Sequence, residues 1–160
     1  MLNSVPLYLL TLVMGADMNQ SISTSDNAAA YGALLLRVAL GVMWIAHSLL
    51  KLLVFTLPGT AQYFQSVGYP GFLAYPVFTV ELAGGIALVL GVYARQVALL
   101  LVPIMVCATR VHLPNGWVHT SQGGGWEYPV FLVVASVALW LLGDGALAVR
   151  RSERFALGAA

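Results

Sequence analysis

The sequence has few charged residues and only one cysteine. Of its 160 residues, 8% are charged and 60% are hydrophobic, and the mean hydropathy is +0.87. Because soluble domains carry about 25% charged residues, this composition indicates a membrane protein. The formal net charge of +1 gives no reason to expect a nucleic-acid partner.

The single cysteine restricts the redox chemistry that the chain itself can perform. Cys107 alone forms neither an intrachain disulfide nor a CxxC motif. Any redox reaction must therefore use a bound cofactor or substrate, or a partner subunit. His47 and His112 are a candidate metal or haem pair, but the expected helices offer no clear third or fourth ligand, so no metal site is predicted.

Four apolar segments are each close to the roughly 20 residues needed to cross a bilayer core of about 30 Å. They are residues 31–55, 72–93, 96–113 and 128–149. Helices are expected, because open strands cannot satisfy their backbone groups in lipid. The predicted fold class is an all-α integral membrane four-helix bundle over residues 31–149, in contact with membrane lipid.

The two ends of the chain fall outside this bundle. Residues 1–30 begin with an apolar stretch too short to span, followed by the polar run "ADMNQSISTSDNAAA". We expect a poorly ordered extension or a helix lying on the membrane surface, and Met18 is an alternative start of the native chain. Residues 150–160 form a basic tail.

The distribution of arginine and lysine predicts the orientation. The loops at 56–71 and 114–126 contain neither residue, whereas Arg95, Arg150, Arg151 and Arg154 lie on the opposite side of the bundle. By the positive-inside rule, both termini are cytoplasmic and both loops are extracytoplasmic in a cell (inner) membrane.

Ionisable residues within the spans are the candidate functional residues. Such residues are rare in membranes and usually face a bundle interior or a cavity. At 1.5 Å per residue, Lys51 lies about 6 Å, His47 about 12 Å and Glu81 about 13 Å below the outer surface. Polar groups from all four spans thus fall in the outer half of the bundle, and no comparable set is expected in the inner half.

Helical spacing assigns roles to these residues. His47 and Lys51 share a helix face, with Trp44 one turn earlier. Glu81 and His47 are the candidate catalytic residues, since both can relay protons. The candidate ligand-binding residues are Lys51, Arg110, His112, Glu127 and Trp44, and Gly84 and Gly85 are expected to allow close helix packing. Alternatively, Glu81 with Lys51 or Arg110 is a buried ion pair that only fixes packing.

The motifs resemble a known family. They are "LLLRVALGVMWIAHSLLKL", "VELAGGIALVLGVYARQVALLLVPIMV", "RVH", "EYPVFLVV" and "LLGDG", in this order. Together they resemble the DoxX family of small four-helix membrane proteins, over residues 34–145. The family takes its name from a subunit of an archaeal thiosulfate:quinone oxidoreductase, so the resemblance implies the membrane fold and a redox-associated role.

Three functions are compatible with these observations. The first is a membrane subunit of a redox complex that binds a quinone in a polar pocket between the helices. The second is a non-catalytic anchor or assembly subunit of a larger complex. The third is a small-molecule or proton-coupled carrier, although the chain shows no obvious inverted repeat. Other protein subunits or further copies of the chain are the expected partners.

The orientation can be tested at Ser121, in the second long loop. A cysteine introduced there should react with a membrane-impermeant thiol reagent in intact cells, because the loop is expected to be extracytoplasmic. The unaltered chain controls for reaction at Cys107. Labelling that occurs only after lysis would reverse the predicted orientation.

Overall fold

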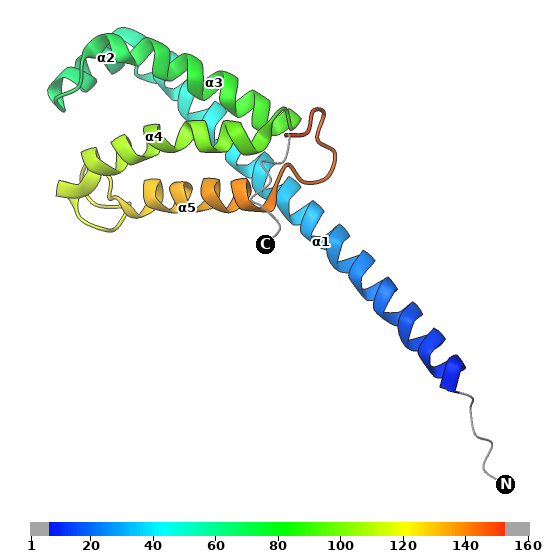
Figure 1. The fold of residues 1–160 in the computed structure, drawn as a ribbon. Helices are drawn as coiled ribbons and strands as arrows, with labels where there is room; N and C mark the ends of the chain where they lie inside the picture. The colour runs from blue at the N-terminus through cyan, green and yellow to red at the C-terminus, as the bar shows by residue number, and fades with distance from the viewer. Residues whose placement is uncertain (1–6, 153–160) are drawn as a thin grey trace.

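The structure is a computed structural model that describes residues 7–152, with side chains described from residue 26 onward. The described residues contain helices α1 (Leu7–Leu49), α2 (Leu57–Ser66), α3 (Ala74–Leu90), α4 (Ala94–His112) and α5 (Glu127–Leu142). A π-helical turn (Leu50–Val54) extends α1, and two 3₁₀ turns (Gly71–Leu73 and Leu113–Asn115) precede α3 and follow α4. α1 packs mainly on α3 and α4 on α5 (Figure 1). The protein is an all-α membrane bundle, as the sequence predicts.

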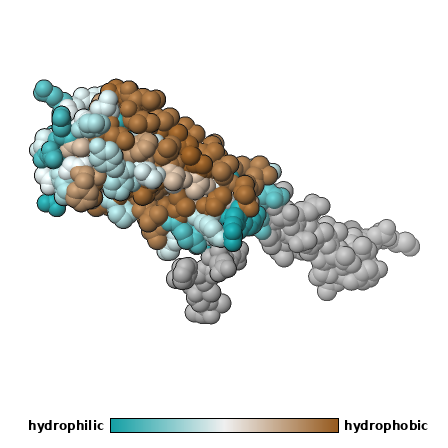
Figure 2. Space-filling model, turned by 90° about the horizontal axis from the view of Figure 1, so that it is seen from above, coloured by the Kyte–Doolittle hydropathy of each residue, from teal (hydrophilic) through white to brown (hydrophobic). Residues whose placement is uncertain are grey.

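Helix length and surface composition suit a bilayer. In the described part of the chain, three helical stretches are long and apolar enough to span it, namely Asp26–Val54, Gly71–Leu90 and Ala94–Asn115. α5 is also apolar but has 16 residues, which gives a length of about 24 Å. On the face seen in Figure 2, apolar side chains form a band across the middle, with hydrophilic side chains at both of its ends.

The ends of the bundle differ in what they contain. We call the end where α2 and the α4–α5 loop lie the loop end, and the end with the α3–α4 turn and residues 143–152 the tail end (Figure 1). α2 occupies part of a segment that the sequence analysis treats as loop. Its start is capped by the Thr56 hydroxyl, which accepts a hydrogen bond from the Gly59 amide at 3.2 Å.

The fourth span is shorter than expected. It ends at Leu142 rather than near residue 149, because Gly143 takes a φ of 99° that a helix cannot contain. The chain then turns back along the tail end, where Val92 and Arg150 form an isolated parallel bridge.

The first helix is longer than expected. α1 begins at Leu7, so residues 7–30 are helical and continuous with the first span. Their sequence contains no proline after residue 6 that would end a helix. Figure 1 shows this part of α1 extending away from the other helices. The division between an extension at 1–30 and a membrane domain stays a prediction, and its parts at residues 1–6 and 153–160 lie outside the described residues.

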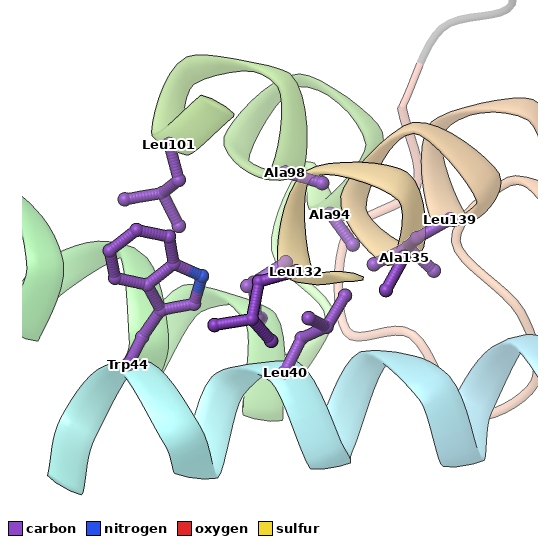
Figure 3. Packing of buried hydrophobic residues seen from close by; sticks show 9 residues of the cluster. Leu40, Trp44, Ala94, Ala98, Leu101, Leu132, Ala135 and Leu139 are labelled. Atoms are coloured by element: carbon purple, nitrogen blue, oxygen red, sulfur yellow. The ribbon is translucent and has the colours of Figure 1, made fainter. Parts of the chain in front are cut away.

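The apolar core lies where α1, α3, α4 and α5 meet. It contains Leu40, Trp44, Leu88, Ala94, Ala98, Leu101, Leu132, Ala135 and Leu139. Figure 3 shows the indole of Trp44 on α1 close to Leu101 of α4 and Leu132 of α5. Trp44 therefore joins the core to the loop end of the bundle.

Glycines set the distance between α1 and α3. A Cβ added to Gly85 would lie 2.9 Å from the carbonyl oxygen of Gly41, and one added to Gly41 would lie 2.7 Å from the carbonyl oxygen of Gly85. Gly84 faces α4 instead, with Leu101 side-chain carbons 3.1 Å from its ideal Cβ position. Gly85 thus packs against α1 and Gly84 against α4. The contact between Gly85 and Gly41 was not predicted from the sequence.

Gly85→Ala should destabilise the bundle by about 1–3 kcal/mol. The added methyl meets rigid backbone atoms of α1, which outweighs the gain of about 1 kcal/mol in helix propensity. The control is Gly32→Ala on α1, where an added Cβ meets nothing within 4 Å. Thermal unfolding in detergent is the measurement, and equal melting temperatures for the two variants would contradict the close approach.

Candidate functional site

A cavity of about 400 Å³ lies at the loop end of the bundle. Side chains from α1, α3, α4, α5 and α2 with its following turn contribute to its wall, which is mainly apolar. The wall residues that carry polar or titratable groups are Trp44, His47, Lys51, Tyr63, Tyr69, Glu81, Cys107, His112 and Tyr128. An apolar cavity with a few convergent polar groups is the usual form of a small-molecule site.

Lys51 and Glu81 form an ion pair in this wall. Lys51 Nζ lies 2.7 Å from Glu81 Oε2, and the two side chains are 18% and 2% exposed. Lys51 also donates to the carbonyl oxygen of His47 at 3.4 Å. The expectation that Glu81 pairs with a basic group from another helix is confirmed. Lys51 stands in the π-helical turn after α1, a local geometry that is frequent at functional sites.

Two further side chains bring unpaired polar atoms to the cavity. Within residues 26–152, Trp44 Nε1 and the Tyr128 hydroxyl are buried without a hydrogen-bond partner. Tyr128 is stacked with His47, at 6.0 Å between ring centroids. In Figure 3 the indole nitrogen is on the side of the ring turned toward Leu132. Since the great majority of buried polar groups have partners, these two atoms are suited to bind a polar ligand.

His112 lies where α4 ends. It contributes to the cavity wall, and its Nδ1 lies 3.0 Å from the carbonyl oxygen of Gly123 in the α4–α5 loop. Arg110, two residues earlier, is exposed and is absent from the wall. Residues two apart do not share a helix face, so only one of the pair points toward the cavity.

Glu127 is not part of the cavity wall either. Its Oε1 accepts hydrogen bonds from the His119 backbone amide at 2.7 Å and pairs with His119 Nδ1 at 2.8 Å. It therefore holds the α4–α5 loop against the start of α5. Because the sequence does not show how a 14-residue connection folds back, this contact was not predicted.

The structure also reveals wall residues that the sequence analysis missed or read differently. Tyr128 belongs to the motif "EYPVFLVV", which by itself does not show that its side chain reaches a cavity, because an aromatic residue near the end of a span is also typical of an interfacial belt. Phe64 and Tyr69 reach the wall because α2 and the turn after it fold over the loop end. Cys107 is in the wall through its position on α4.

A second polar cluster lies at the tail end, where none was expected. Arg37 is 1% exposed and donates to the carbonyl oxygens of Asp144 and Ala146 at 3.0 and 3.4 Å. Asp144 Oδ1 accepts from the Arg95 amide at 3.2 Å and from the Ser152 hydroxyl at 2.7 Å. These contacts hold residues 143–152 against α1 and α4. The sequence analysis missed the cluster because it placed Asp144 within the fourth span.

Metal ligands do not gather in the described part of the chain. Among those residues, no group of three or more His, Cys, Asp or Glu side chains is arranged to hold a metal ion. The polar groups of the cavity are instead an ion pair, imidazoles, an indole, phenols and a thiol. Their chemistry is hydrogen bonding and proton exchange.

Comparison with known proteins agrees with this architecture. The DoxX family model matches residues 32–120. The chain belongs to the DoxX family. The match includes the cavity residues of α1, α3 and α4 and ends before Tyr128.

A curated relative comes from Bacillus subtilis (strain 168) and bears the name "Putative oxidoreductase CatD". It is 34% identical over 119 residues, which cover 74% of this chain and 84% of the relative. No solved structure matches the chain.

Removing one member of the ion pair should destabilise the protein more than removing both. Glu81→Gln leaves the Lys51 ammonium charged and partly buried. Breaking a fully buried pair costs about 3–5 kcal/mol, and the loss here should be smaller because Lys51 keeps some exposure. Lys51→Met leaves the buried carboxylate alone and should cost as much or more. Combining the two should restore most of the stability. Melting temperatures of the three variants test this, and purely additive losses would show that the two groups are not coupled.

Proposed function

We propose that this protein is a membrane subunit of an oxidoreductase and that its cavity binds the head group of a quinone. The observation that carries the proposal is the apolar cavity of about 400 Å³ whose wall holds an ion pair and two unpartnered hydrogen-bond donors. Family membership and the name of the Bacillus subtilis relative support a redox-associated role. The quinone is inferred from the chemistry of the cavity.

A quinone head group fits these groups because it is an apolar ring with carbonyl oxygens that accept hydrogen bonds. Trp44 Nε1 can only donate, whereas the Tyr128 hydroxyl can donate to a carbonyl or accept from a hydroxyl. Tyr128 can therefore serve both the oxidised and the reduced form of the ligand. The apolar remainder of the wall suits a ring with a lipid tail.

Reduction of a quinone consumes two electrons and two protons. The electrons come from a reduced cofactor of a partner subunit, of the flavin or iron–sulfur class. The protons pass through titratable groups of the wall, for which Glu81 and His47 are the candidates. Lys51 holds the Glu81 carboxylate in place at 2.7 Å and can also donate to the ligand.

The arrangement in the membrane follows from the same proposal. The loop end faces the extracytoplasmic side of the inner membrane, and the apolar band of Figure 2 contacts lipid. The partner subunit that supplies electrons then binds at one surface of the bundle. A non-catalytic anchor would share this placement but would need no ligand in the cavity, so ligand binding separates the two functions.

The purified protein in lipid nanodiscs should bind a short-chain ubiquinone saturably and unfold at a higher temperature when the ligand is present. Tyr128→Phe should weaken binding about 5-fold, the effect of losing one hydrogen bond of roughly 1 kcal/mol. The matched control is Tyr75→Phe, an exposed tyrosine of α3 outside the cavity. Absence of saturable binding to the unaltered protein would contradict the proposed function.

A further inference from the structure

The glycine run "SQGGGWE" lies against the end of α4 and contacts His112. The carbonyl oxygen of Gly123 is 3.0 Å from His112 Nδ1 and accepts a second hydrogen bond from Asn115 Nδ2, also at 3.0 Å. Asn115 Nδ2 donates to the Gly124 carbonyl oxygen as well, at 2.9 Å. His112 on α4 and Asn115, one turn later, thus both contact the loop backbone at Gly123.

Only glycine fits at these loop positions. Gly123 and Gly124 have φ values of +83° and +78°, which other residues rarely adopt. A Cβ on Gly123 would lie 2.9 Å from Asn115 Nδ2, and one on Gly125 would lie 2.2 Å from the Val118 carbonyl oxygen. The glycines therefore allow the loop backbone to approach the imidazole of His112 closely.

This contact decides where the neutral imidazole of His112 carries its proton. A carbonyl oxygen can only accept a hydrogen bond, so Nδ1 must be the protonated nitrogen. The bond made by one ring nitrogen fixes the state of the other, which leaves Nε2 with a free lone pair. His112 is a candidate ligand-binding residue from the sequence, and in its neutral form this geometry makes its Nε2 an acceptor.

We propose that His112 Nε2 is the atom through which the cavity exchanges a proton with its ligand, and that Asn115 and the glycine loop are the positioning elements that fix its tautomer. This inference rests on the proposed quinone site. When a quinone is reduced, two electrons come from the partner's cofactor. One of the two protons passes from the Nε2–H of the His112 imidazolium to a quinone oxygen, and the second reaches the other oxygen through Glu81 or His47. The remaining imidazole is neutral, and its Nδ1–H stays on the Gly123 carbonyl.

His112 is well placed for this exchange because it joins two environments. It contributes to the cavity wall at the loop end, and its hydrogen bond to Gly123 reaches an exposed loop. Glu81 and Lys51, by contrast, are largely buried between α1 and α3. A proton taken up from the aqueous side at the loop end can therefore enter through His112 without crossing the apolar core.

The tautomer can be measured without a ligand, by ¹⁵N NMR of the protein labelled at its histidine rings in nanodiscs. The chain has three histidines, and His47→Gln and His119→Gln variants assign the signals. At a pH where the rings are neutral, His112 should show a protonated Nδ1 and an unprotonated Nε2. A protonated Nε2 in the unaltered protein would overturn the inference.

Asn115→Ala tests the positioning role. Without the asparagine, the loop carbonyls lose a donor and the His112 signals should shift toward a mixture of the two tautomers. The control is Gln122→Ala, an exposed residue of the same loop. Unchanged His112 signals in the Asn115 variant would refute the positioning role, even if the variant were less stable.

Addition of a short-chain ubiquinol then tests contact with the ligand. Its hydroxyl should donate to Nε2 and move that resonance, with Nδ1 little changed. If the ubiquinone analogue binds but the quinol leaves the Nε2 signal in place, proton exchange at His112 is overturned while the proposed function stands. If neither compound binds, both proposals fail, and the affinity measurement shows this independently of the spectra.

Discussion

The loop end of this protein depends on the ion pair between Lys51 and Glu81. A carboxylate on an apolar helix requires a partner, because a single unpaired charge in this environment is strongly unfavourable. Lys51 supplies it from another helix at 2.7 Å. The close contact of Gly41 and Gly85 brings α1 and α3 near enough for the two side chains to meet. The glycine contact and the ion pair thus support each other along the same pair of helices.

The cavity beside this pair combines two kinds of polar group. Lys51 and Glu81 pair with each other, whereas Trp44 Nε1 and the Tyr128 hydroxyl have no hydrogen-bond partner among the described residues. Electrostatic and hydrogen-bonding interactions are stronger in such an apolar surrounding than in water. A ligand that accepts hydrogen bonds would therefore gain from the unpartnered donors and be oriented by them.

The polar groups at the two ends of the bundle are arranged differently. At the tail end, buried Arg37 donates to the backbone carbonyl oxygen of Asp144. The Asp144 carboxylate accepts hydrogen bonds from the backbone amides of Arg95 and Ser152. These contacts hold residues 143–152 in place. Arg37 is not part of the wall of the loop-end cavity. At the loop end the polar groups line a cavity and leave donors free.

The sequence by itself determined the membrane class, the helical fold and the family, and it named Lys51 as one of two candidate partners of Glu81. The membrane class and the helical fold follow from composition and segment length, the family follows from the resemblance of the motifs, and the pairing of Glu81 follows from the cost of an isolated buried charge. Only the tertiary structure decided that Tyr128 reaches the cavity, that Arg110 and Glu127 do not, and that α2 contributes to the cavity wall. Such contacts depend on side-chain direction and on how irregular connections fold back. The hydrogen bond from His112 to Gly123 has the same origin, because a loop carbonyl finds its partner only once the helices have been placed.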